Sequence, residues 1–115
     1  MWSLLLASVL TACTGGGSDS AEVDACADQP IVTYETFGAG FLTENCQSCH
    51  ASTAPDRKGA PESVVFDTVD DAWAQRDRIL ARAAIDTPEM PPLGGTTDDD
   101  RARLKIWLTC AEEGT

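Results

Sequence analysis

The sequence predicts an all-α domain with three main helices. In three segments, mostly apolar residues recur at the 3.6-residue period of a helix, and each segment begins with residues typical of a helix N-terminus. No segment alternates apolar and polar residues over the length of a strand, although residues 63–66 could form a short extended stretch. At 115 residues, the chain has room for one domain.

The first two helices are predicted from their recurring residues and their ends. The first covers residues 34–46, with Thr33 as its N-cap. The second covers residues 70–85, where Thr68 and Asp71 resemble a capping box and a nearby proline cannot continue the helix. The recurring positions are Tyr34, Phe37, Phe41 and Leu42 in the first helix, and Trp73, Arg76, Ile79, Leu80 and Ala83 in the second.

The third predicted helix covers residues 98–111. Its first turn carries three aspartates, which the helix dipole favours at an N-terminus. Leu104, Trp107 and Leu108 form its apolar face, and Gly114 can stop it.

The segment Cys-Gln-Ser-Cys-His, from Cys46 to His50, has the spacing of a c-type haem-attachment site. The thiols of Cys46 and Cys49 can add to the two vinyl groups of one porphyrin, and His50, the only histidine in the chain, can bind the iron. The alternatives are half of a zinc site or a dithiol redox motif. No second CxxC or HxxxH completes a zinc site, and no βαβ pattern accompanies the motif.

Met90 is the expected second iron ligand. It is the only methionine besides Met1, and it lies in the segment Pro-Glu-Met-Pro-Pro. A thioether is a soft, neutral ligand that favours reduced iron and raises the reduction potential. The prolines restrict the backbone on both sides of the methionine. The alternative role of Met90 is to fill a gap in the core.

Residues 30–115 resemble the single-haem, class I type of cytochrome c domain, because a helix, CxxCH, loops, a second helix and a closing helix follow in the order of that family. The resemblance implies a cytochrome c-like fold, in which the three main helices pack around one covalently attached haem c. It also implies that the first and last helices cross. Gly38 and Leu42 would then pack against Leu104 and Trp107.

The same resemblance implies roles around the haem. In the family, a proline carbonyl about a dozen residues after the histidine accepts the imidazole Nδ1–H, and Pro61 has nearly that offset from His50. The alternative for Pro61 is an ordinary turn proline. Trp73, Arg76 and Arg82 are candidates to meet the haem propionates, although Trp73 could equally belong to the core and either arginine could pair with nearby aspartates.

The remaining three cysteines fit an exported lipoprotein. Leu-Thr-Ala-Cys, which ends at Cys13, follows an apolar run and resembles the lipobox of bacterial lipoproteins, whose cysteine is lipidated. Cys26 and Cys110 then remain, one on each side of the haem domain, and an exported chain favours a disulfide between them.

These assignments divide the chain into a lipoprotein-type signal peptide over residues 1–12, a lipidated N-terminus and flexible linker over residues 13–29, and the cytochrome c domain over residues 30–115. The linker is polar and rich in glycine, as is typical of a flexible tether. The signal peptide is short and lacks a basic residue after Met1, so its true start could lie upstream. The alternative is a buried apolar N-terminal segment, which is too short to cross a bilayer.

The chain is strongly acidic. Nineteen acidic residues against eight basic residues give a formal net charge of −11. Such a surface argues against binding to nucleic acid and to anionic lipid headgroups. It keeps the protein soluble, and it would also steer the protein toward a redox partner with a basic docking surface.

Together these features predict a monomeric, membrane-tethered carrier of single electrons in the bacterial cell envelope, on the periplasmic or outer-membrane side. We do not expect an enzyme, because the single histidine is committed to the iron and no nucleophile–base pair remains. One alternative is a haem-based sensor or peroxidase-like protein in which Met90 leaves the iron site open. Another is a structural lipoprotein whose CxxC forms a disulfide or holds zinc.

Overall fold

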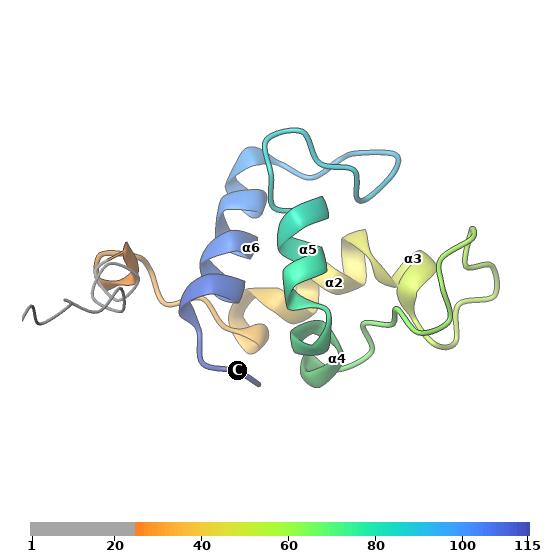
Figure 1. Cartoon of the computed structure of the whole chain (residues 1–115), viewed down its shortest axis with the longest axis horizontal. Coiled ribbons are helices and arrows are strands. Elements are labelled where there is room, and N and C mark those ends of the chain that lie inside the picture. Colours follow the sequence, from red (N-terminus) through yellow and green to blue (C-terminus); the bar gives the residue numbers. More distant parts are fainter. Residues whose placement is uncertain (1–24) are drawn as a thin grey trace, which may run out of the picture.

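The structure of the chain, a computed structural model, describes residues 25–115. The predicted signal peptide, Cys13 and most of the predicted linker lie outside these residues. Within them the regular elements are all helical, and no helix is long and apolar enough to cross a membrane. In chain order the elements are η1 (Tyr34–Gly38), α2 (Ala39–Asn45), α3 (Gln47–His50), α4 (Val69–Ala74), α5 (Arg76–Arg82) and α6 (Asp98–Cys110) (Figure 1).

The first predicted helix is confirmed as η1 followed directly by α2. Thr33 is its N-cap, and the side chains of Thr33 and Thr36 each accept a hydrogen bond from the other's backbone N–H, which completes a capping box. The first turn is wider than an α-helix, because the N–H of Gly38 donates to the carbonyl of Thr33 at 3.1 Å. The apolar period of the sequence does not indicate this π-helical start.

The second predicted helix is present but shorter and interrupted. The capping box between Thr68 and Asp71 is confirmed, with hydrogen bonds of 3.0 and 3.2 Å. Gln75 separates α4 from α5, and the helix ends at Arg82 instead of residue 85. It ends there because the carbonyl of Arg82 accepts hydrogen bonds from the backbone N–H groups of residues 89 and 90, at 2.8 and 3.0 Å.

The third predicted helix is confirmed as α6. The side chain of Thr97 caps it by accepting a hydrogen bond from the backbone N–H of Asp100 at 3.1 Å. Leu104, Trp107 and Leu108 are fully buried, as the apolar face predicted.

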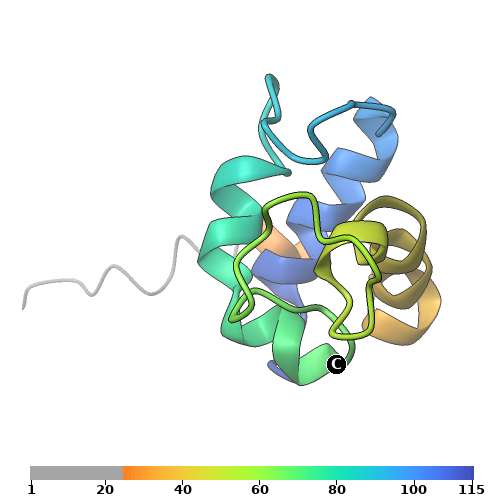
Figure 2. The ribbon, with the colours of Figure 1, turned by 90° about the vertical axis from the view of Figure 1, so that its right-hand side faces the viewer.

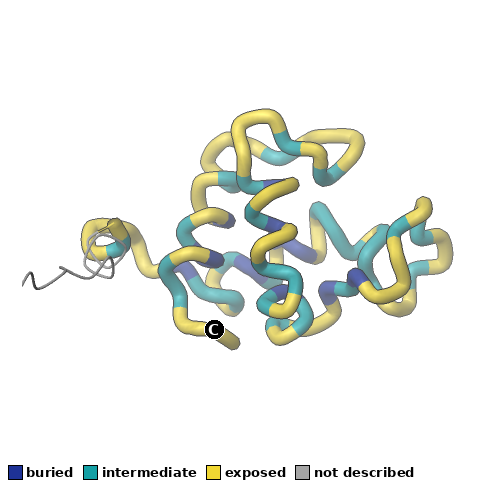
Figure 3. The backbone as a smooth tube through the Cα atoms, viewed as in Figure 1, coloured by how far each residue is buried: buried dark blue, intermediate teal, exposed yellow. Residues whose placement is uncertain are grey.

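The core lies where the first and last helices meet. In Figure 1, α2 runs across the direction of α6, and Figure 3 shows buried stretches where these helices and α5 face one another. Gly38 is buried at the crossing, and a Cβ added there would lie 2.7 Å from two ring carbons of Trp107. The predicted approach of Gly38 to Trp107 is therefore confirmed. The buried apolar residues are Val32, Phe41, Leu42, Val64, Phe66, Ala72, Ile79, Ala83, Leu104, Trp107 and Leu108.

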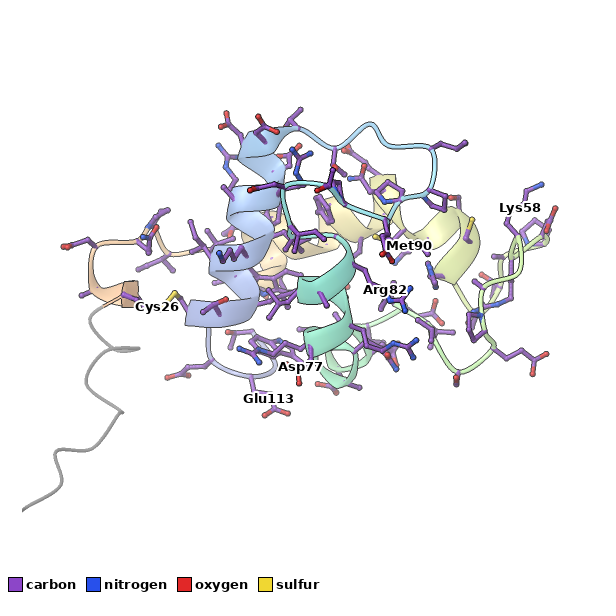
Figure 4. All side chains as sticks on the ribbon, turned by 45° about the horizontal axis from the view of Figure 1, so that its top comes forward. Cys26, Lys58, Asp77, Arg82, Met90 and Glu113 are labelled. Atoms are coloured by element: carbon purple, nitrogen blue, oxygen red, sulfur yellow. A yellow bond between two sulfur atoms is a disulfide. The ribbon has the colours of Figure 1, made fainter. Side chains whose placement is uncertain are left out.

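Cys26 and Cys110 lie together, as predicted, with their sulfur atoms 2.02 Å apart. The pair joins the start of the described chain to the last residue of α6 (Figure 4). The two cysteines are 84 positions apart, and the segment between them includes every helix that carries a candidate site residue.

Candidate functional site

The CxxCH motif forms a single helical turn at one end of the molecule. Cys46 lies at the junction between α2 and α3, and its carbonyl accepts hydrogen bonds from the N–H groups of Cys49 and His50, at 3.2 and 2.9 Å. Both thiols and the imidazole therefore lie on one short helical segment. Both cysteines are free and partly buried. In Figure 2 this end of the molecule faces the viewer, and the loop after α3 crosses it.

The two thiols lie in different environments. Cys46 packs against the hydrophobic core, and its burial raises the pKa of its thiol to about 12. The Cys46 thiol is therefore protonated at neutral pH. A redox dithiol uses the thiolate, which burial disfavours at this position. Residues 25–115 contain no group of three or more His, Cys, Asp or Glu side chains placed to hold a metal ion.

A backbone carbonyl fixes the ring of His50. Nδ1 of His50 lies 3.0 Å from the carbonyl oxygen of Val64. A carbonyl oxygen only accepts hydrogen bonds, so Nδ1 is the donor, and in the neutral imidazole the lone pair is then on Nε2. Nε2 is therefore the nitrogen that could bind a metal, and the bond to Val64 would orient it and increase its basicity.

Pro61 does not have the role that the family resemblance implied. Its carbonyl accepts hydrogen bonds from Nη2 of Arg57 and from the N–H of Val64, at 2.8 and 3.0 Å. The latter bond closes a turn, and this turn brings the carbonyl three residues further along the chain to His50. The histidine's partner is therefore the carbonyl of Val64 and not that of Pro61.

The segment after this turn holds α3 in place. The N–H of Phe66 donates to the carbonyl of His50 at 2.9 Å, and the side chain of Gln47 donates to the carbonyl of Phe66 at 2.9 Å. The rings of Phe66 and His50 lie 4.9 Å apart between centroids. Asp67 accepts a hydrogen bond from the N–H of Ser52 at 2.9 Å. Hydrogen bonding by the side chain and then the backbone of Ser52 lowers the pKa of Asp67. The extended stretch suggested at residues 63–66 is not a strand. It forms hydrogen bonds with Gln47 and His50 and so fixes the position of α3.

Arg57 is a site residue that the sequence did not reveal. Its guanidinium donates to four backbone carbonyls of the same loop, those of Ala51, Ala60, Pro61 and Val64, at 2.7 to 3.5 Å. In the sequence it is one of several charged residues in a loop, and no spacing rule distinguishes it. Its contacts depend on the fold of the loop, which sequence patterns do not specify.

Met90 lies at the edge of the same core that covers Cys46. Its side chain is half-buried and packs against that core. Its backbone is tied to the end of α5 through the carbonyl of Arg82, and a turn closed by Pro91 and Gly94, at 2.9 Å, follows it. Figure 4 shows Met90 between α5 and α3. The two predicted ligand segments, far apart in sequence, therefore meet one hydrophobic cluster.

Of the three residues proposed to meet haem propionates, Trp73 has a free donor. Its Nε1 is buried and has no hydrogen-bond partner within residues 25–115. Arg76 instead donates to the carbonyl of Leu108 and to the carboxylate of Asp77, the latter at 3.0 Å. The guanidinium of Arg82 lies 3.4 Å from the carboxylate of Glu89. Both arginines therefore already have hydrogen-bond partners within the protein.

These residues fit a covalently attached haem. Two free thiols and the imidazole share one helical turn, Nδ1 of His50 is engaged by a carbonyl so that Nε2 faces no protein partner among residues 25–115, and Met90 packs against the same core as Cys46. The unsatisfied Nε1 of Trp73 is a buried donor that an anionic propionate would satisfy, at a position where burial without a partner is costly. Comparison of the chain with protein-family models, with curated proteins and with solved structures finds no match.

Proposed function

We propose that the protein is a membrane-tethered carrier of single electrons with a class I cytochrome c-like fold. One haem c would be attached through Cys46 and Cys49, with His50 and Met90 as its axial ligands. The observation that supports this most strongly is the hydrogen bond from Nδ1 of His50 to the buried carbonyl of Val64. With Nδ1 engaged as a donor, Nε2 is the nitrogen left to bind iron, in the same helical turn as the two free thiols.

The bound haem would supply the ferric–ferrous couple. His50 would bind the iron in a fixed orientation, because the Val64 carbonyl and the Phe66 ring restrict its imidazole. Met90 would bind the iron through a soft thioether that favours the reduced state. Two side chains bound to the iron would leave no site for oxygen or a substrate, and this is why we propose a carrier and not an enzyme.

The surrounding residues would keep the site dry and rigid. Phe41 belongs to the core cluster against which Leu80, Cys46 and Met90 pack, so the haem would extend an existing core instead of lying on the surface. Trp73 would donate its unsatisfied Nε1 hydrogen to a propionate. A site that changes little between its two charge states transfers electrons with a small reorganisation.

The proposed cellular setting rests on Cys13, the polar linker and the Cys26–Cys110 pair. A lipidated Cys13 and a polar linker would tether the domain to a membrane of the bacterial envelope, and covalent haem attachment and the Cys26–Cys110 pair both suit an exported protein. The net charge of −11 favours a redox partner with a basic docking surface.

The test is haem staining after denaturing electrophoresis of the full chain, made in a bacterium that attaches haem c. Wild type and Ser48→Ala, which changes the motif but keeps its thiols and histidine, should stain. The double variant Cys46→Ala, Cys49→Ala should not. A wild-type band without haem, beside a stained control cytochrome, would refute the proposal and favour a structural lipoprotein.

A further inference from the structure

Arg57 is built into the support of the candidate iron ligand. Nη1 donates to the carbonyl of Ala51, the residue directly after His50, at 2.7 Å. Nη2 donates to the carbonyl of Val64 at 3.0 Å, and this oxygen is the one that accepts from Nδ1 of His50. The guanidinium and the imidazole therefore share one acceptor, and their two nitrogen atoms are no farther apart than the sum of those distances.

Sharing an acceptor changes the imidazole. A carbonyl oxygen has two lone pairs, and a cationic donor on one of them withdraws electron density from the other. The Nδ1–H bond of His50 is then weaker than it would be to an unshared carbonyl, so the imidazole has less anionic character. A less basic axial imidazole stabilises ferric iron less, and this raises the reduction potential.

The charge of Arg57 acts in the same direction. All four of its acceptors are neutral carbonyls, and none of the four ion pairs among residues 25–115 involves it. Asp67 is close enough for Arg57 to contribute to its lowered pKa, but Asp67 is exposed and its charge is screened by water. The nearby Asp56 is paired with Lys58 at 2.7 Å. A positive charge beside the ligand, in no ion pair among residues 25–115, also favours ferrous iron.

We propose that Arg57 is a positioning residue that raises the reduction potential of the iron centre, by sharing the Val64 carbonyl with His50 and by placing a positive charge beside it. This inference rests on the proposed function. It assigns to one loop arginine both the shape of the loop of residues 51–64 and the electronic state of the histidine ligand.

The test is a redox titration of the haem-loaded protein as wild type, Arg57→Gln, Arg57→Lys and Arg103→Gln. Arg103 is exposed on α6, which lies away from the loop after α3 in Figure 1, so its variant removes the same charge on a different part of the molecule. At a fixed solution potential, Arg57→Gln should lower the ferrous-to-ferric ratio several-fold, where tenfold corresponds to about 59 mV for one electron. Arg57→Lys keeps the charge but loses the several N–H donors of the guanidinium, so it should lower this ratio less. Arg103→Gln should leave the ratio almost unchanged.

A second readout separates the electronic role from a merely structural one. In the proton NMR spectrum of the reduced protein, Arg57→Gln should move the Nδ1–H resonance of His50 downfield, because the unshared carbonyl accepts more strongly. A loosened loop would move it upfield. An upfield shift, or equal potentials for Arg57→Gln and Arg103→Gln, would overturn the inference while the haem remains. A wild-type protein without haem would instead refute the proposed function, and this inference with it.

Discussion

Replacing Gly38 by alanine tests the helix crossing that organises the fold. Gly38 has ordinary helical backbone angles, so the substitution strains no dihedral. A Cβ there would meet three ring carbons of Trp107 at 2.7, 2.7 and 2.9 Å. Carbon atoms without a bond between them pack at roughly 3.5 to 4.0 Å. One of the two helices, or the Trp107 ring, must therefore move.

The ring of Trp107 has little freedom to move. It is fully buried, and its Nε1 donates to the carbonyl of Thr115 at 2.7 Å. The rings of Tyr34 and Trp73 lie 6.1 and 6.3 Å from it, between centroids. Overpacking of a core costs about 1–3 kcal/mol, and alanine returns up to about 1 kcal/mol of helix propensity over glycine. We expect a net loss of about 1–2 kcal/mol in the free energy of unfolding.

Thermal unfolding followed by circular dichroism measures this loss, and Gly40→Ala is the matched control. Gly40 lies two residues along the same helix, where an added Cβ meets nothing within 4 Å. Gly38→Ala should lower the midpoint by about 5–15 °C, whereas Gly40→Ala should leave it unchanged or raise it. If both variants were equally stable, the proposed close crossing of η1 and α6 would be wrong.

The remaining predictions concern the disulfide cysteines, Trp73 and the thiol of Cys46. Replacing Cys26 and Cys110 together by serine should lower the free energy of unfolding by about 4 kcal/mol in a denaturant titration, because the chain-entropy model gives this value for a loop of such length; an unchanged midpoint would argue against a disulfide. Trp73→Phe should destabilise the haem-loaded protein by about 1.5–3 kcal/mol if Nε1 donates to a charged propionate, and an equal or higher stability would remove that role. In the haem-free chain at neutral pH, alkylation followed by mass spectrometry should modify Cys49 well before Cys46, whose pKa of about 12 keeps it protonated. Because this pKa lies above the ordinary value of 9.0, the stability contributed by the buried thiol should persist below pH 9 and be lost as the pH rises toward 12. Equal alkylation rates of Cys46 and Cys49 at neutral pH would contradict the burial of Cys46.

The helices could be predicted because their signals are local. The capping side chain of Thr68 and the apolar period of Leu104, Trp107 and Leu108 act within a few residues, and both are found as the pattern indicates. The premature end of α5 could not be predicted. It depends on the carbonyl of Arg82 accepting from Met90, eight residues later, and the sequence alone does not fix such a loop contact.

The candidate site divides in the same way. Cys46, Cys49 and His50 are adjacent in sequence, so their grouping in one turn follows from the motif. The histidine's acceptor is Val64 instead of Pro61, because the Pro61 carbonyl is used to close a turn. Arg57, Val64 and Phe66 enter the site through loop geometry, and their residue types alone give no signal for it.

The visible absorption spectrum of the purified, oxidised and reduced mature protein tests the central claim most directly. It should be low-spin in both states and should include the weak band near the infrared edge that marks a methionine–iron bond. That band should vanish in Met90→Ala, and the reduced variant should then bind carbon monoxide freely. A high-spin, five-coordinate wild-type spectrum with unhindered carbon monoxide binding would contradict the electron-carrier account and place an open iron site at the centre of the function.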